Sequence, residues 1–201
     1  MTEPTPHLVR GFWDHMTDHF HSAVVDKSSA PEMRLVSRAL STLGILDATT
    51  FLTKYATTLA HRIYLPFEPG VAVPGWSLWT QIEVCVHEHQ HVVQYDLLGA
   101  VAYGARYLTS SAQRARLEAE AYRCNLELDW WRHGKLVDPM EFAERLRAYG
   151  ASGVDVAMAR AILAASGESV KQGAVINPST FVALQWLNAH AASLRALPKV
   201  A

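Results

Sequence analysis

The segment that most constrains the fold is the run from Trp79 to Leu98, which contains no proline or glycine and is followed by Gly99. Its apolar residues recur at helical spacing, as one buried stripe would require: Ile82, Val86, Val93 and Leu97. This pattern predicts one long helix. We expect the helix to end at the glycine, because glycine readily adopts the backbone conformations that terminate helices.

The same run carries the pattern H-E-x-x-H, formed by His87, Glu88 and His91. Residues four apart lie on one face of a helix, so His87 and His91 can present two imidazoles to one metal ion. Glu88 can reach a water on that metal and act as a general base, whereas His89 is expected to point away. Polar groups on a mostly apolar helix are costly without partners, and a metal ion is the simplest partner for them. The alternative is a hydrogen-bonded histidine cluster without metal.

A catalytic zinc site usually has three protein ligands and a water. The residue six positions after His91 is Leu97, which excludes the pattern H-E-x-x-H-x-x-G-x-x-H. The helix predicted at 112–133 offers two further candidates, Glu118 and Glu120. Glu120 lies about 60° from the apolar stripe of that helix and Glu118 about 100°, counting about 100° per residue. Burial alone therefore favours Glu120, and the residues by themselves leave both glutamates open.

H-E-x-x-H followed by a helical E-x-x-A, here Glu118 and Ala121, resembles the gluzincin group of zincin metallopeptidases. The chain is more narrowly similar, over residues 79–130, to members in which the glutamate lies in E-x-x-A-[DN]. The resemblance implies that Glu118 is the third zinc ligand and that the residue after the alanine supports the site. Tyr122 occupies that position here. A phenol can hydrogen-bond a histidine or an oxyanion, but it cannot replace a carboxylate.

These residues predict a zinc-dependent metallopeptidase that hydrolyses peptide bonds in a protein or peptide substrate. Glu88 would take a proton from a zinc-activated water and pass it to the leaving amine. Gln94, one turn after His91, is expected to orient a ligand. Several side chains are candidate oxyanion donors: Tyr95, Tyr103, Tyr107, Tyr122 and His133. The alternatives are a catalytically inactive zinc-binding or interaction module on the same frame, and a helical binding protein without metal.

Composition favours an ordinary globular protein. Half of the 201 residues are hydrophobic and 18% are charged. A net charge of -1 and a sequence pI of about 6.8 give no indication of nucleic-acid binding. We expect no membrane partner and a cytoplasmic location, because the sequence has no spanning apolar run and no signal-peptide pattern. Cys85 and Cys124 are expected to pack in the core.

The expected fold is α+β and mainly helical, with a zincin-like core, a small β-sheet before the H-E-x-x-H helix and a C-terminal helical part. Residues 1–30 are expected to form a polar N-terminal arm and residues 31–201 a single zincin-like domain. Within that domain the metal-site core would cover about 60–134 and the helical part 135–201. Helices are expected at 31–43, 47–59, 101–108, 112–133, 138–149, 153–166 and 177–194.

Two short segments before the motif are β-like, 62–67 and 71–74, with a turn at Pro69 and Gly70 between them. Pro74 suits an edge strand, where its missing N–H is not needed. Such an edge could accept an extended peptide as an added strand, or both strands could be purely structural.

Two other features stay open at this stage. The N-terminal pairs Asp14-His15 and Asp18-His19 repeat at helical spacing, but no third ligand follows, which favours a solvated helix over a second metal site. Four tryptophans flank the motif and would either line an apolar subsite or belong to the core: Trp76, Trp79, Trp130 and Trp131.

Overall fold

The structure is a computed structural model that describes residues 2–42 and 48–195. The described part of the chain is mainly helical with a small sheet, which confirms the predicted α+β class. Its helices are α1 (Pro6–Phe20), α2 (Pro31–Thr42), α3 (Ala48–Lys54), α4 (Leu78–Leu98), α5 (Ala100–Thr109), α6 (Ser111–His133), α7 (Pro139–Arg145), η1 (Leu146–Tyr149), α8 (Gly153–Lys171), α9 (Pro178–His190) and η2 (Ala192–Leu194). Its strands are β1 (Ala23–Asp26), β2 (Thr57–Leu59) and β3 (Arg62–Leu65).

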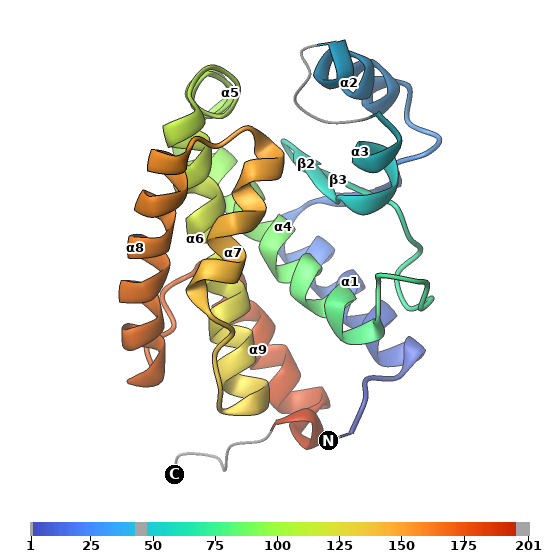
Figure 1. The fold of residues 1–201 in the computed structure, drawn as a ribbon. Coiled ribbons are helices and arrows are strands. Elements are labelled where there is room, and N and C mark those ends of the chain that lie inside the picture. Colours follow the sequence, from blue (N-terminus) through green and yellow to red (C-terminus); the bar gives the residue numbers. More distant parts are fainter. Residues whose placement is uncertain (1, 43–47, 196–201) are drawn as a thin grey trace.

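Helix α4 runs through the middle of the molecule (Figure 1). It packs against α1 on one side and against α6 and α9 on the other, while α8 packs against α6 and α7. The main core cluster accordingly draws its side chains from α1, β3, α4, α6 and α9. A second cluster lies among α6, α7 and α8, and a smaller one among α2, α3 and β3. Because helices and sheet surround α4, its polar motif is largely buried.

The motif helix forms as predicted. It begins after Ser77, whose side chain accepts a backbone hydrogen bond in the first turn, and it ends at Gly99. Ile82 and Val86 are fully buried, as expected. Leu97 is 77% exposed, so its assignment to the buried stripe is wrong. The last turn of α4 lies beyond the core clusters, and helical spacing alone does not reveal where a core ends.

The sheet has the order β1-β3-β2, with β1 parallel and β2 antiparallel to β3. Strand β3 confirms the strand predicted at 62–67. The helix predicted at 47–59 is wrong in its second half, because α3 ends at Lys54 and residues 57–59 form β2. Two consecutive threonines begin β2, and β-branched residues favour strands. The predicted helix boundaries at residues 43 and 47 lie outside the described residues.

The strand predicted at 71–74 is also wrong. This segment is a loop with an isolated bridge between Val73 and Trp76. The Gln81 side chain accepts a hydrogen bond from Gly70 N at 2.8 Å and donates one to Val71 O at 2.8 Å. A side chain of α4 therefore supplies the backbone partners that a neighbouring strand would otherwise provide.

The first 30 residues, expected to form a polar arm, supply a core helix and a strand. Helix α1 buries four apolar side chains at helical spacing: Val9, Phe12, Trp13 and Met16. Strand β1 pairs with β3, with Ala23 opposite Arg62. The many histidines of this segment lie between the apolar positions of α1, so composition conceals an amphipathic helix.

A helix is present in each segment predicted after α4, and α8 extends further, to Lys171. The helices predicted at 138–149 and 177–194 are shorter than expected: α7 ends at Arg145 and α9 at His190, and the 3-10 turns η1 and η2 follow them. Helix α6 starts after Ser110 and ends at Gly134, which has a left-handed conformation. Cys85 and Cys124 are buried and unbridged, as predicted for core residues. Within the described ranges, no helix has the length and apolar character needed to cross a membrane.

Charged side chains are buried where α4 and α6 meet. The Arg132 guanidinium lies 4.1 Å from the ring centroid of Trp79 and donates a 2.8 Å hydrogen bond to Glu3. Burial, together with the nearby Asp129 carboxylate, raises the pKa of Glu83 to about 7. A hydrogen bond with Trp79 and the guanidinium groups of Arg132 and Arg145 lower this pKa, but by less. Folding therefore costs more when Glu83 is ionised.

This cost predicts a pH-dependent effect of Glu83→Gln. The folded protein holds the Glu83 proton up to about pH 7, whereas the unfolded chain loses it near pH 4.5, so stability falls as pH rises through that window. We expect the variant to equal wild type at pH 4 and to exceed it at pH 8 by up to about 3 kcal/mol. Urea unfolding monitored by circular dichroism across this range measures it, with exposed Glu141→Gln as control. Parallel stability curves for wild type and Glu83→Gln would contradict the prediction.

Candidate metal centre

Three side chains of the predicted site meet between α4 and α6. The Nε2 atom of His87 lies 3.4 Å from Glu118 Oε2, and the Nε2 atom of His91 lies 3.6 Å from Glu118 Oε1. One ligand atom from each residue lies within 4.8 Å of the others, so the group can hold a metal ion. In residues 2–42 and 48–195, no other group of three such side chains is found, and the N-terminal histidine pairs do not form one.

Glu118, and not Glu120, faces the histidines. Glu118 is buried at the site, whereas Glu120 accepts a 3.0 Å hydrogen bond from Gln90 Nε2. The preference for Glu120 from burial alone is therefore not supported by the positions of the two side chains. His89 points away from the site, as predicted, and lies within hydrogen-bond distance of Ser22 Oγ and Cys85 O.

Amide side chains fix the orientation of both histidines. His91 Nδ1 donates to Gln94 Oε1 at 2.8 Å, and Gln94 Nε2 donates to Leu117 O at 2.9 Å. His87 Nδ1 donates to Asn125 Oδ1 at 3.3 Å. In the neutral form of each ring the proton therefore lies on Nδ1, which leaves the Nε2 lone pair for a metal. The donor set and this outer layer therefore fit a divalent cation.

The buried Glu118 carboxylate has a positive partner within the group itself. Burial by itself would lower the pKa of His91, but the Glu118 carboxylate outweighs it and raises that pKa to about 9. Burial would raise the pKa of Glu118, and the imidazoles of His91 and His87 outweigh it and lower that pKa. The carboxylate thus stays ionised in a buried position beside the His91 imidazolium, and a metal ion bound there would take the place of the His91 Nε2 proton.

Glu88 lies beside this group and is held by the sheet. The Thr58 hydroxyl donates a 2.7 Å hydrogen bond to Glu88 Oε2, from β2 at the edge of the sheet. Sequence reasoning missed Thr58, because 30 residues and a change of element separate it from Glu88. It also missed Asn125, although Asn125 lies seven residues after Glu118 on the same helix, a spacing that returns to the same face.

The tyrosines near the site have different positions. Tyr107 donates a 2.6 Å hydrogen bond to Glu118 Oε1, and Tyr103 lines the same cavity. The Tyr122 ring packs edge-on against His87, with 4.8 Å between ring centroids. Of the other oxyanion candidates, Tyr95 packs on His61 and His133 on Trp79, and neither lines the cavity.

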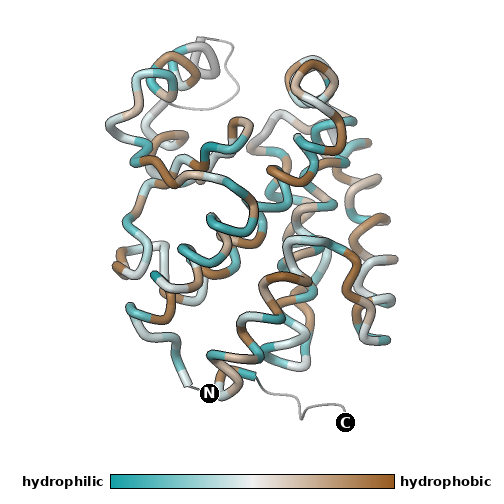
Figure 2. The backbone as a smooth tube through the Cα atoms, turned by 180° about the vertical axis from the view of Figure 1, so that it is seen from behind, coloured by the Kyte–Doolittle hydropathy of each residue, from teal (hydrophilic) through white to brown (hydrophobic). Residues whose placement is uncertain are grey.

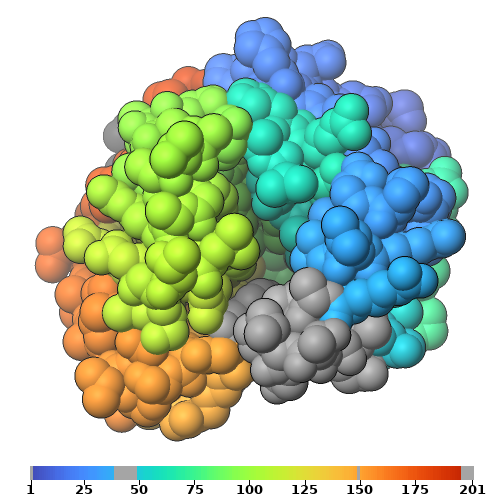
Figure 3. Space-filling view, turned by 90° about the horizontal axis from the view of Figure 1, so that it is seen from above, coloured from blue at the N-terminus to red at the C-terminus, as the bar shows by residue number. Residues whose placement is uncertain are grey.

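The three candidate ligands and Glu88 line a cavity of about 360 Å³. Its remaining lining comes from α2, α3, β2, α5, α6, η1 and residues 55–56. This lining is mostly apolar, with Arg114 as its charged member, and includes Met33, Val36, Phe51, Leu59 and Leu108. The surface is hollowed between α5 and the side formed by α2 and the sheet (Figure 3). The four tryptophans near the motif pack in or against the core clusters and do not line this cavity.

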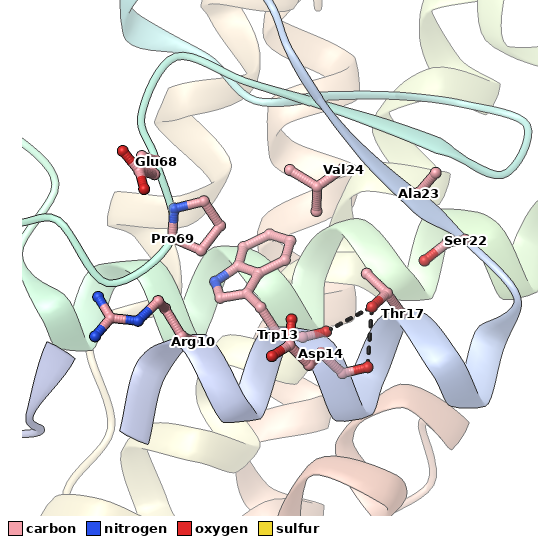
Figure 4. A pocket seen from close by; sticks show the side chains of 9 residues that line it. All are labelled: Arg10, Trp13, Asp14, Thr17, Ser22, Ala23, Val24, Glu68 and Pro69. Carbon is pink, nitrogen blue, oxygen red and sulfur yellow. Dashed lines mark hydrogen bonds between the residues drawn. The ribbon is translucent and has the colours of Figure 1, made fainter. Parts of the chain in front are cut away.

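A second hollow, of about 390 Å³, lies between α1, β1 and the loop at Pro69 (Figure 4). It shares no lining residue with the first cavity. Arg10, Asp14 and Glu68 give it charges of both signs. It contains no histidine and therefore lacks the ligand set of the first site.

The fold and the site together define a helical α+β protein with a buried two-histidine, one-carboxylate group and a neighbouring glutamate. No protein-family model, no curated protein and no solved structure matches this chain.

Proposed function

We propose that the protein is a zinc-dependent metallopeptidase. One observation carries the proposal: the ligand atoms of His87, His91 and Glu118 lie within 4.8 Å of one another, and Glu88 lines the same cavity. Two histidines and a glutamate, with a position left for water, are a set that catalytic zinc sites use. The resemblance of this motif and its E-x-x-A glutamate to gluzincins supports the same reaction class.

Bound zinc would supply a Lewis acid for the peptide carbonyl and lower the pKa of the attacking water. The protein then has to position the substrate and move one proton. Glu88 takes the proton from the water and delivers it to the leaving amine nitrogen. Thr58 occupies Oε2 of Glu88, so we assign proton transfer to Oε1. Gln94 and Asn125 keep the two imidazoles in the tautomer that leaves Nε2 free.

The substrate would be an extended segment of a protein or peptide. Strand β2 lies at the edge of the sheet, and its residues 57–59 line the cavity. A peptide added to this edge would run past Glu88, with its backbone paired and one side chain directed into the cavity. The apolar lining favours a large apolar side chain there. The edge for peptide addition is thus β2, and not the segment at 71–74.

Zinc stoichiometry tests the site directly. Elemental mass spectrometry of the reconstituted protein should give about one zinc per chain, and His87→Ala should remove it. His19→Ala is the matched control, since His19 is exposed on α1 and should leave the zinc content unchanged. Loaded wild type should then cleave members of a peptide library and lose this activity to a chelator. Absence of zinc after reconstitution would overturn the proposal.

A further inference from the structure

Several exposed apolar side chains belong to the elements that surround the cavity or adjoin them. Leu59 and Leu108 line the cavity and are also exposed to solvent. Leu35 is exposed on α2, between the lining residues Met33 and Val36. Two more exposed side chains belong to the end of α4 and the start of α5. We define the apolar rim as Leu35, Leu59, Leu97, Val101 and Leu108.

Helix α5 has an apolar face on each side. Tyr103 and Tyr107 face the cavity. Val101 and Leu108, two turns apart, are 88% and 78% exposed, and Leu108 also borders the cavity. A helix that is apolar on both sides is usually covered on both. Seen from behind, apolar segments of α5 and α2 lie at the same end of the molecule (Figure 2).

The segment that forms the α5 side of this region is basic. Residues 97–117 contain three arginines and no acidic residue. Arg106 and Arg116 are exposed. The acids that flank the segment are both engaged: Asp96 pairs with His61 at 2.8 Å, and Glu118 is buried at the metal site. The α5 side of the mouth is therefore apolar and basic.

We propose that the apolar rim docks the protein on the surface of an anionic lipid bilayer. Apolar side chains that enter the headgroup region, together with arginines that attract anionic lipids, are the two contributions that hold proteins at such surfaces. The rim residues come from several elements around an opening and do not line one groove, which suits a broad surface better than a single peptide helix. Docking would turn the cavity mouth toward the lipid. The expectation of no membrane partner rested on the lack of a spanning segment, and surface binding needs none.

Vesicle sedimentation tests this docking without reference to peptidase activity. The full chain is mixed with vesicles of phosphatidylglycerol and phosphatidylcholine in equal parts, or of phosphatidylcholine alone. We expect binding to the anionic vesicles, weakened by 0.5 M salt. Val101→Ser with Leu108→Ser should weaken it at least about tenfold, and Arg106→Gln roughly fivefold. Ile176→Ser is the matched control, because Ile176 is 65% exposed in the loop before α9 and should bind as wild type.

Three results would overturn the proposal. The first is no sedimentation with anionic vesicles. The second is equal loss of binding in Ile176→Ser and in the α5 variant, which would indicate nonspecific adhesion. The third is a dimer in light scattering that Val101→Ser with Leu108→Ser converts to a monomer, since the rim would then be an interface between two copies of the chain.

Discussion

Glu118→Gln should lower the affinity for zinc by at least about a hundredfold, and Glu120→Gln should leave it nearly unchanged. The Glu118 carboxylate supplies the negative charge of the ligand group and lies 3.4 and 3.6 Å from the two Nε2 atoms. A glutamine keeps the size of the side chain but removes that charge. Glu120 instead bonds with Gln90, outside the ligand group. Competition against a fluorescent zinc chelator measures both affinities.

The two variants control for each other, since they make the same change two residues apart on α6. Thermal unfolding of the metal-free proteins checks that both remain folded. Loss of zinc in Glu120→Gln, or its retention in Glu118→Gln, would contradict the ligand assignment that the geometry gives. It would also remove the basis for the resemblance to gluzincins, which rests on the glutamate of E-x-x-A.

The choice between these glutamates shows where sequence periodicity stops being informative. The ends of α4 and α6 were predictable, because Gly99 and Gly134 follow them directly. Helix α6, however, is buried on several sides: Cys124 and Leu128 belong to the main cluster, whereas other residues of the same helix belong to the second cluster. A helix buried around most of its circumference has no clear polar face. An angle measured from one apolar stripe therefore cannot place Glu118.

The small sheet was less predictable than the helices, because its pairing is not local. Strand β1 pairs with β3 across 39 residues, with Ala23 opposite Arg62. Strand β2 spans only 57–59, too short for an alternating pattern to stand out. Contacts of the site that cross elements share this difficulty. The hydrogen bond from Thr58 to Glu88 forms only because the edge of the sheet lies over α4. The residue spacing within either segment does not predict that contact.

Glu88→Gln should reduce kcat/KM by about 10² to 10⁴-fold while zinc content stays at the wild-type level. Glutamine keeps the size of the side chain, and its amide oxygen can still accept the hydrogen bond from Thr58. The change therefore preserves the packing of α4 but removes the group that takes and returns a proton. Rates on a peptide selected from the library, with elemental analysis of the same samples, measure both quantities.

Thr58→Val separates the position of Glu88 from its chemistry. It removes the bond to Oε2 and keeps the carboxylate, so we expect a smaller loss, about tenfold, with zinc retained. Thr58→Ser should restore most of the rate, because serine keeps the hydroxyl. Equal rates for wild type and Glu88→Gln would exclude Glu88 as the base. Full zinc occupancy without any wild-type cleavage would instead favour the inactive zinc-binding module, in which Tyr107 stays bonded to Glu118 and the cavity serves binding alone.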